Sequence, residues 1–200
     1  MPSVIIGSIP LPYQLEEDAI VKNIGVERIL PFLTQEAKRL EKAGVDFIVM
    51  PCNSLHIFIE EIRKVVSVPV LSIVEETVKF LARENMRTIG MISTAITVEN
   101  KLYENALTKS SVKCIVPDEL QQARIGKLIL NLTRGQGKNA DRDELIKIIN
   151  DFESKKIDCV ILACTDLQLL IPHHPTIKIF DTMKILADAT VEMITGNQIK

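Results

Sequence analysis

Two cysteines occur in matching sequence frames, and each could act as an acid or a base. In both frames an aspartate is followed by an apolar run and then by a cysteine. The two segments are Asp46-Phe-Ile-Val-Met-Pro-Cys52 and Asp158-Cys-Val-Ile-Leu-Ala-Cys164. Small polar residues follow each cysteine. A thiolate accepts a proton and a thiol donates one. Two thiols on opposite sides of a substrate could therefore take a proton from one face of a carbon and return one to the other face.

The apolar runs predict where these cysteines lie in the fold. Both runs have the length and the β-branched content of buried parallel strands, and a helical stretch precedes each of them. Open α/β sheets bind ligands at the carboxyl ends of their strands. Because each cysteine follows its strand, we expect both thiols at such an edge.

The rest of the chain alternates between short strands and helices. Strands are expected at 3–7, 46–50, 68–71, 87–92, 112–116, 158–164 and 177–180, and helices at 27–42, 54–65, 75–84, 99–109, 119–132, 141–154 and 183–194. Gly44 is expected to end the first helix. The alternation predicts an α/β fold of parallel sheets covered by helices. The repeated frame predicts two similar lobes with a cleft between them. The first lobe would hold residues 1–84 and about 183–200, and the second residues 85–182.

Composition excludes several classes of protein. The chain has 200 residues, 46% of them hydrophobic and 25% charged, which gives a globular chain with an ample core. A net charge of -2 gives no reason to expect nucleic acid or an anionic membrane as partner. The sequence contains no membrane-spanning run and no signal-peptide pattern. Four cysteines do not suggest a disulfide scaffold. We therefore expect a cytoplasmic protein with reduced thiols.

The cysteines also have interpretations other than acid/base catalysis. A cysteine at a strand end is commonly a small buried hydrophobe, and Cys114 and Cys159 lie in apolar strand patterns that predict this role. Cys52 and His56 have a C-x3-H spacing that would suit zinc, and two histidines also follow Cys164. Because no second close ligand pair accompanies them, no metal site is predicted.

The residues around both cysteines resemble the signatures of the aspartate/glutamate racemase family. Pro51-Cys52-Asn53-Ser54-Leu55-His56 resembles its first signature, P-C-N-T-x-H, and Ala163-Cys164-Thr165-Asp166 resembles its second, G-C-T-E. Residues 91–103 and 116–119 also match, so the resemblance covers nearly the whole chain. The aspartate branch fits better, because the glutamate branch usually has histidine where Asp166 stands.

The resemblance implies a cofactor-independent, two-base racemase or epimerase of an acidic amino acid, most simply aspartate. It also implies two flavodoxin-like lobes and a homodimer, with no cofactor. Cys52 and Cys164 would be the acid/base groups, and Asp166 would orient or poise Cys164. The residues implied to bind the substrate are Asn53, Ser54, Thr94, Arg134 and Thr165.

Three features depart from the family pattern. Family members usually begin with a strand and a turn like G-G-M-G-P, whereas the strand expected here at 3–7 matches the family's second strand. The following loop usually carries an arginine in a pattern like P-D-R-T, but residues 12–16 contain no positive charge. Ala163 replaces the glycine before the second cysteine. The missing arginine leaves room for a different or larger substrate side chain.

Two further classes of function remain open. Related chemistries on this fold include hydantoin racemisation, maleate isomerisation and malonate decarboxylation. The intact cysteine pair argues against a one-cysteine decarboxylase, but not against the other two. A non-catalytic descendant that binds a small acid or a partner protein is a different alternative. The polar residues retained beside both thiols argue against that alternative.

Overall fold

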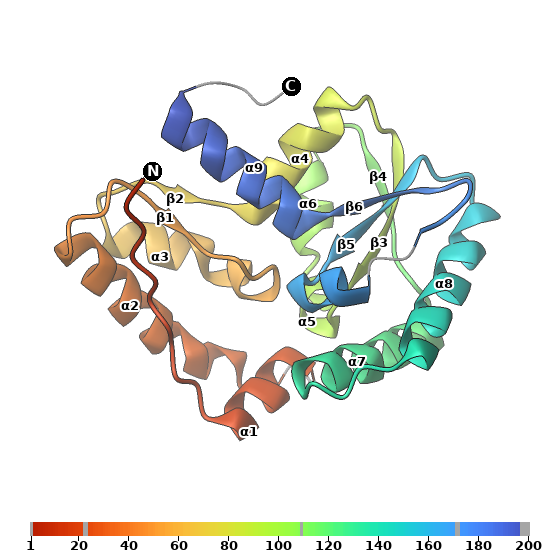
Figure 1. Cartoon of the computed structure of the whole chain (residues 1–200), viewed down its shortest axis with the longest axis horizontal. Helices are drawn as coiled ribbons and strands as arrows, with labels where there is room; N and C mark the ends of the chain where they lie inside the picture. The colour runs from red at the N-terminus through yellow and green to blue at the C-terminus, as the bar shows by residue number, and fades with distance from the viewer. Residues whose placement is uncertain (1, 22–23, 109, 171–172, 197–200) are drawn as a thin grey trace.

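The computed structural model describes residues 2–21, 24–108, 110–170 and 173–196. It contains two parallel sheets, as the alternation predicted (Figure 1). The first sheet pairs β1 (Ile48–Val49) with β2 (Val70–Leu71). The second has the order β4-β3-β5-β6, formed by Lys113–Ile115, Thr88–Ser93, Cys159–Ala163 and Lys178–Asp181. The α/β class is therefore confirmed.

Helices connect and cover these strands. They are α1 (Tyr13–Glu16), η1 (Glu17–Val21), η2 (Val26–Ile29), α2 (Leu30–Lys42), η3 (Ser54–Phe58), α3 (Ile59–Val65), α4 (Ile73–Arg83), α5 (Ala95–Glu99), α6 (Leu102–Leu107), α7 (Glu119–Thr133), α8 (Asn139–Glu153), η4 (Thr165–Leu170) and α9 (Thr182–Thr195). Gly44 follows α2 with a φ of 84°, as its predicted capping role requires. Within the described ranges, none of these helices is long and apolar enough to cross a membrane.

The second sheet is buried on both faces. Ile92, Val160 and Leu162 pack against α7 and α8. Met91 and Ile161 point the other way and pack against α4, α6 and α9. This alternation of neighbouring residues follows the two-residue period of a strand. It explains why the sequence here is apolar without interruption.

Helices α4 and α9 join the two halves of the chain. In α4, Ile73, Val74 and Leu81 belong to the core of the second sheet. Helix α9 packs along α4. The first sheet has a separate core, which includes Leu33 of α2 and Ile48 of β1. The lobe boundaries at residues 84/85 and 182/183 stay a prediction.

The predicted strand at residues 3–7 is wrong. Val4 and Ile6 are 73% and 84% exposed, and the segment is paired with neither sheet. Its Val-Ile-Ile run has strand propensity, but a strand forms only where a neighbour supplies backbone partners. Residue 7 instead lies beside α2. The side chain of Glu36 occupies the space that a side chain on Gly7 would need.

The aspartate that opens the second cysteine frame has a structural role. The Asp158 carboxylate accepts hydrogen bonds from the backbone N–H groups of Arg87 and Thr88, at 2.7 and 2.8 Å. These two bonds lower the pKa of Asp158. They fix the start of β5 beside the start of β3. They therefore help to set the register of the two strands, which places Cys164 next to Thr94 at the other end.

Candidate active site

The two frame cysteines lie where their strands end. Cys52 follows β1 after two residues, and Cys164 follows β5 directly. Strand β3 pairs with β5 so that Ser93 is opposite Ala163. Thr94 and Cys164, the next residue of each strand, therefore leave the sheet side by side.

A bridge of hydroxyl groups brings the Cys52 loop to the same place. Ser54 Oγ and Thr94 Oγ1 are 2.7 Å apart, and both residues are buried. Thr97 Oγ1 lies 3.1 Å from the Thr94 hydroxyl and 3.4 Å from that of Ser54. The bridge joins the residue two beyond Cys52 to the residue beside Cys164. The bridge therefore brings the loop that carries Cys52 to the strand end beside Cys164.

The environment of Cys164 favours the neutral thiol. Burial raises the pKa of Cys164, and the charges of Asp166 and Cys52 raise it further. Backbone N–H groups of Asp166 and Leu167 act in the opposite direction but are outweighed. The Cys164 thiol donates to Asp166 Oδ2 at 3.7 Å, and burial raises the pKa of that carboxyl. These surroundings therefore favour the S–H form of Cys164 over the thiolate.

Replacing Asp166 with asparagine is expected to speed alkylation of Cys164. The carboxylate raises the pKa of Cys164, so removal of its charge increases the reactive thiolate fraction. Iodoacetamide labelling at pH 8, followed by peptide mass spectrometry, should show a rise of a few-fold to about tenfold. Cys159, which is fully buried in β5, serves as the internal control and should not change. Slower labelling of Cys164 would mean that Asp166 activates the thiol instead.

The Asn53 side chain is engaged within the protein. Its Oδ1 accepts a hydrogen bond from the Tyr103 hydroxyl at 2.5 Å, and its Nδ2 donates to Thr182 Oγ1 at 3.0 Å. Thr182 in turn donates to the Leu162 carbonyl of β5 at 2.9 Å. All three side chains are buried. This network holds the residue after Cys52 against α6 and the start of α9, so Asn53 could offer a substrate its backbone but not its amide group without rearrangement.

Arg134 lies in a different cluster. It ends α7, and its Nε donates to the Tyr13 hydroxyl at 2.6 Å while a terminal nitrogen contacts Glu17 at 2.9 Å. These contacts raise the pKa of Arg134. Helix η1, which carries Glu17, packs against both α5 and α7. Helix α5 contributes Thr97 to the hydroxyl bridge and also contacts η1, so this helix connects the Arg134 cluster to the bridge. Thr165, the first residue of η4, is half-buried beside Cys164.

His56 does not present a nitrogen to a metal. Its Nδ1 lies 2.6 Å from the Cys52 carbonyl oxygen, and its Nε2 accepts the Ile73 N–H at 3.1 Å. His174 contacts Asn150 and accepts from the Ile177 N–H. No cluster of three potential metal ligands occurs in the part of the chain that the structure describes.

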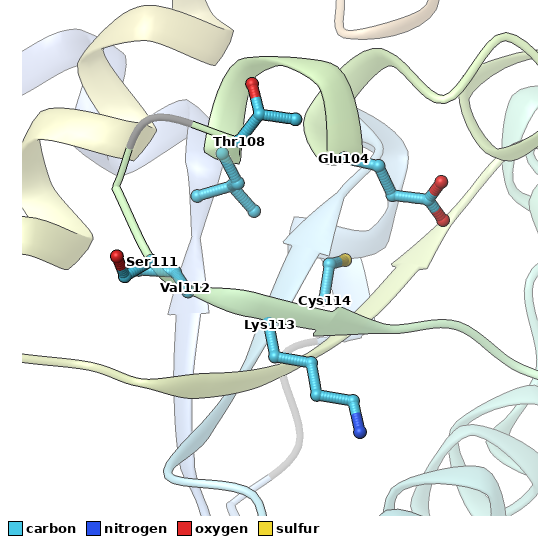
Figure 2. A pocket seen from close by; sticks show the side chains of 7 residues that line it. Glu104, Thr108, Ser111, Val112, Lys113 and Cys114 are labelled. Atoms are coloured by element: carbon cyan, nitrogen blue, oxygen red, sulfur yellow. The ribbon is translucent and has the colours of Figure 1, made fainter.

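Two surface hollows lie away from the frame cysteines. One, of about 340 Å³, lies between α6 and the edge strand β4, and its lining includes Glu104 and Cys114 (Figure 2). Burial, assisted by Glu104, raises the pKa of Cys114 to about 12. The other, of about 370 Å³, lies at the turn between α7 and α8. Cys159 is fully buried, as its predicted core role requires. Cys114 is only half-buried, because it lines the hollow beside β4.

Sequence reasoning missed most of the partners that hold the site residues. The sequence pattern indicates Tyr103 and Thr97 only as parts of a matching segment, and it gives no signal for Thr182. Tyr103 is fully buried, and a buried tyrosine hydroxyl normally finds a partner. That rule could have suggested a polar network, but not that Asn53 would complete it.

Comparison with known proteins gives a consistent result. The family model described as Asp/Glu/Hydantoin racemase matches residues 16–190. The broad specificity amino-acid racemase RacX of Bacillus subtilis (strain 168) is 31% identical over 198 residues, which cover 98% of this chain and 84% of the relative. A glutamate racemase from Aquifex pyrophilus is 28% identical over 82% of this chain, and the match spans 60% of that longer protein. The solved structure of an aspartate racemase from Picrophilus torridus superposes with a TM-score of 0.77 at 24% identity, covering 96% of this chain and 78% of that one. The chain belongs to the Asp/Glu/hydantoin racemase family.

Proposed function

We propose that this protein is a cofactor-independent amino-acid racemase in which Cys52 and Cys164 act as alternate base and acid. The observation that carries the proposal is the hydroxyl bridge between Ser54 and Thr94, because it gathers the ends of β1, β3 and β5. The effect of the Cys52 charge on the pKa of Cys164 supports the same arrangement.

The chemistry needs no external electron carrier. One thiolate takes the α-proton, and the electron pair of the broken C–H bond stays on the α-carbon as a carbanion that is delocalised into the carboxylate. The opposite thiol then gives its S–H proton to the other face of the carbon and becomes a thiolate. The reverse sequence converts the product enantiomer. Hydroxyls of Ser54 and Thr94, with Thr165 and backbone N–H groups beside both cysteines, would hold the substrate carboxylate.

The first candidate substrate is aspartate, or another acidic amino acid. Its support is the similarity of the two signatures to the aspartate branch, in particular Asp166 after the second cysteine. In this proposal, Arg134 binds the side-chain carboxylate. The substrate would then have to replace Glu17, which contacts Arg134 at 2.9 Å.

A broader substrate range is the second candidate, and the same contact favours it. Glu17 already supplies a carboxylate to Arg134, and residues 12–16 add no cation. Binding a dicarboxylate in a site that lacks a second cationic partner is costly. The relative RacX is described as a broad specificity amino-acid racemase. Amino acids with neutral side chains therefore belong in the first set of substrates to be tried.

Chiral chromatography of the products from a panel of L- and D-amino acids tests this proposal. We expect conversion of at least one amino acid in both directions, without pyridoxal phosphate or metal. Hydantoins and maleate serve as parallel substrates for the related chemistries. Conversion of only one of those compounds would reassign the reaction, and no turnover of any would favour a binding protein.

The Glu17→Gln substitution is expected to separate the two substrate ranges. Without the Glu17 charge, Arg134 is available to a substrate carboxylate, so kcat/KM for aspartate should rise roughly fivefold, within the modest range of exposed ion pairs. The value for a neutral amino acid should stay within about twofold of wild type, on the same modest scale of exposed ion pairs. Arg134→Gln is the matched control and should lower only the value for aspartate. Equal changes for acidic and neutral substrates would place this pair outside substrate selection.

The resemblance also supports a cytoplasmic homodimer acting on a small molecule. The chain mass is 22.4 kDa. Light scattering coupled to size exclusion should therefore give twice that mass, and a chain-sized mass would contradict the dimer.

A further inference from the structure

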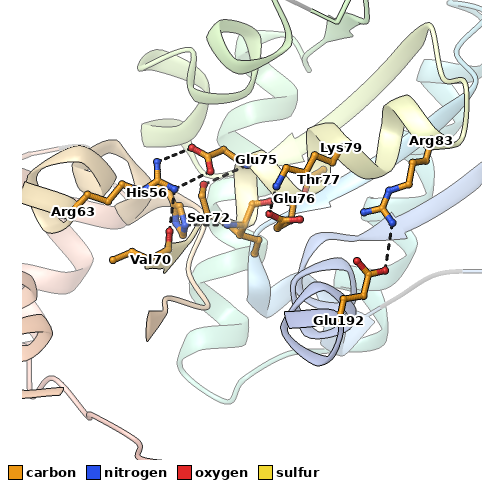
Figure 3. Close-up of polar contacts among 11 residues, drawn as sticks. His56, Arg63, Val70, Ser72, Glu75, Glu76, Thr77, Lys79, Arg83 and Glu192 are labelled. Carbon is orange, nitrogen blue, oxygen red and sulfur yellow. Dashed lines mark hydrogen bonds and ion pairs between the residues drawn. The ribbon is translucent and has the colours of Figure 1, made fainter. Parts of the chain in front are cut away.

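His56 connects the Cys52 loop to a distant helix. The residue is 1% exposed and lies in η3, four residues after Cys52. Its Nδ1 is 2.6 Å from the Cys52 carbonyl oxygen. Its Nε2 is 3.1 Å from the backbone nitrogen of Ile73, the first residue of α4 (Figure 3). One ring therefore contacts the peptide of Cys52 and the start of another element.

These two partners determine the protonation of the ring. A carbonyl oxygen can only accept a hydrogen bond, so Nδ1 must carry a proton and donate to Cys52. A backbone N–H can only donate, so Nε2 must offer its lone pair to Ile73. Both bonds exist together only in the neutral Nδ1–H form of His56. The site consequently selects one of the three protonation states of this side chain.

The charges around the ring are consistent with this form. Burial lowers the pKa of His56 to about 4, although the backbone carbonyls of Cys52 and Leu71 act in the opposite direction. Two charged side chains also influence the ring: Glu75 raises its pKa and Arg63 lowers it. Arg63 and Glu75 are paired at 2.7 Å, so their effects partly cancel (Figure 3). The ring is therefore neutral at physiological pH and is not itself an acid or base there.

The contacts of His56 complete the restraint of Cys52. The Cys52 N–H donates to the Met50 carbonyl at 2.9 Å, while His56 holds the Cys52 carbonyl. Both peptide groups around the thiol are thus fixed. Ile73 itself is fully buried in the core of the second sheet. The contacts of His56 therefore hold the Cys52 peptide in place relative to the second sheet, which also carries Cys164.

We propose that His56 is a positioning residue for racemisation, whose neutral ring clamps the Cys52 peptide to the start of α4 and so fixes the Cys52 thiol against the substrate carbon. The inference rests on the proposed function, because it assumes that Cys52 exchanges a proton with the substrate. Proton transfer between a thiol and carbon depends steeply on the distance and alignment of the two groups.

Two substitutions each keep one hydrogen bond of the His56 ring and remove the other. His56→Asn puts an amide N–H where Nδ1 lies and can keep the bond to Cys52, but it cannot reach Ile73. His56→Gln can reach Ile73 with its amide oxygen but has no donor in the Nδ1 position. Each variant breaks the link between Cys52 and α4, so we expect kcat of both to fall by about 10- to 100-fold with KM nearly unchanged. Wild-type kcat in either folded variant would overturn the clamp.

Two measurements that need no turnover test the same clamp. Nitrogen-15 NMR of the wild-type protein should show His56 as the neutral Nδ1–H tautomer at pH 7, with a titration midpoint near pH 4. Amide hydrogen exchange at Ile73 should be faster than wild type in His56→Asn and nearly unchanged in His56→Gln, because only the former loses the acceptor of the Ile73 N–H. A protonated ring or the Nε2–H tautomer at pH 7, or equal exchange at Ile73 in the two variants, would reject the clamp.

These readouts keep the two proposals separable. If wild-type protein racemises no substrate while the tautomer and the exchange at Ile73 agree with expectation, the proposed function fails and the clamp on Cys52 survives. If wild-type protein is active but either folded variant keeps wild-type kcat, the clamp fails and the racemase survives.

Discussion

Replacing Cys164 with alanine is expected to abolish racemisation, lowering kcat by about 10³-fold or more. The variant has no group to donate a proton to one face of the substrate carbon. Cys164 is 7% exposed, so water is poorly placed to substitute for it. Cys52→Ala should have a similar effect from the opposite face. Chiral chromatography of the products measures both losses, and circular dichroism verifies that each variant is folded.

The two alanine variants should also differ from each other. Each keeps one thiol, so each should exchange the α-proton of only one enantiomer, and the two variants should prefer opposite enantiomers. Cys114→Ala is the matched control, because Cys114 lines the hollow beside β4 rather than the strand ends that carry Cys52 and Cys164. It should keep wild-type kcat. Near-normal racemisation by either site variant, or exchange of the same enantiomer by both, would contradict the two-base assignment.

Tyr103→Phe is expected to destabilise the fold and to slow catalysis together. The substitution removes the hydroxyl that donates to Asn53 Oδ1 at 2.5 Å and leaves that oxygen buried without this donor. An unsatisfied buried polar group costs about 1–3 kcal/mol. Asn53 directly follows Cys52, so its loosening should also lower kcat by about tenfold through misplacement of the thiol.

Urea unfolding followed by far-ultraviolet circular dichroism measures the stability change, since the chain contains no tryptophan. Tyr13→Phe is the matched control, because Tyr13 is the other tyrosine in the sequence and is 55% exposed. It should change the free energy of unfolding by less than about 0.5 kcal/mol. A Tyr103→Phe protein with wild-type stability and kcat would show that the network does not hold the Cys52 loop.

The sequence predicted the second sheet well because its strands are buried on both faces. The predicted bounds of β3, β5 and β6 each lie within one residue of the observed bounds. The helix predicted at 99–109 is interrupted, since Lys101 adopts a left-handed conformation with φ of 50° between α5 and α6. Helices α1 and η1 were not predicted, because their mainly polar residues show no clear apolar stripe. For residues 3–7 a strand was predicted but does not form. The segment has a high strand propensity, but no neighbouring strand pairs with it.

The positions of the candidate site residues could be predicted, but their side-chain partners could not. Cys52, Ser54, Thr94 and Cys164 all follow strand ends, and the ends of parallel strands meet at one edge. Tertiary contacts, by contrast, connect residues that local patterns do not relate. Thr182 is 129 positions from Asn53. The partner of Arg134 likewise comes from an unpredicted element, since Glu17 lies at the start of η1.

The central claim is that two thiols act on opposite faces of one carbon, and deuterium incorporation tests it most directly. The protein is equilibrated in D2O and given one enantiomer of its best substrate, and both enantiomers are separated at low conversion for mass spectrometry. The account predicts deuterium at the α-carbon of essentially every product molecule and almost none in the recovered substrate, because the proton is removed by one thiol and the deuteron is delivered by the other. Early deuterium in recovered substrate and product alike would indicate a single base serving both faces, and would contradict the assignment of Cys52 and Cys164 as a pair.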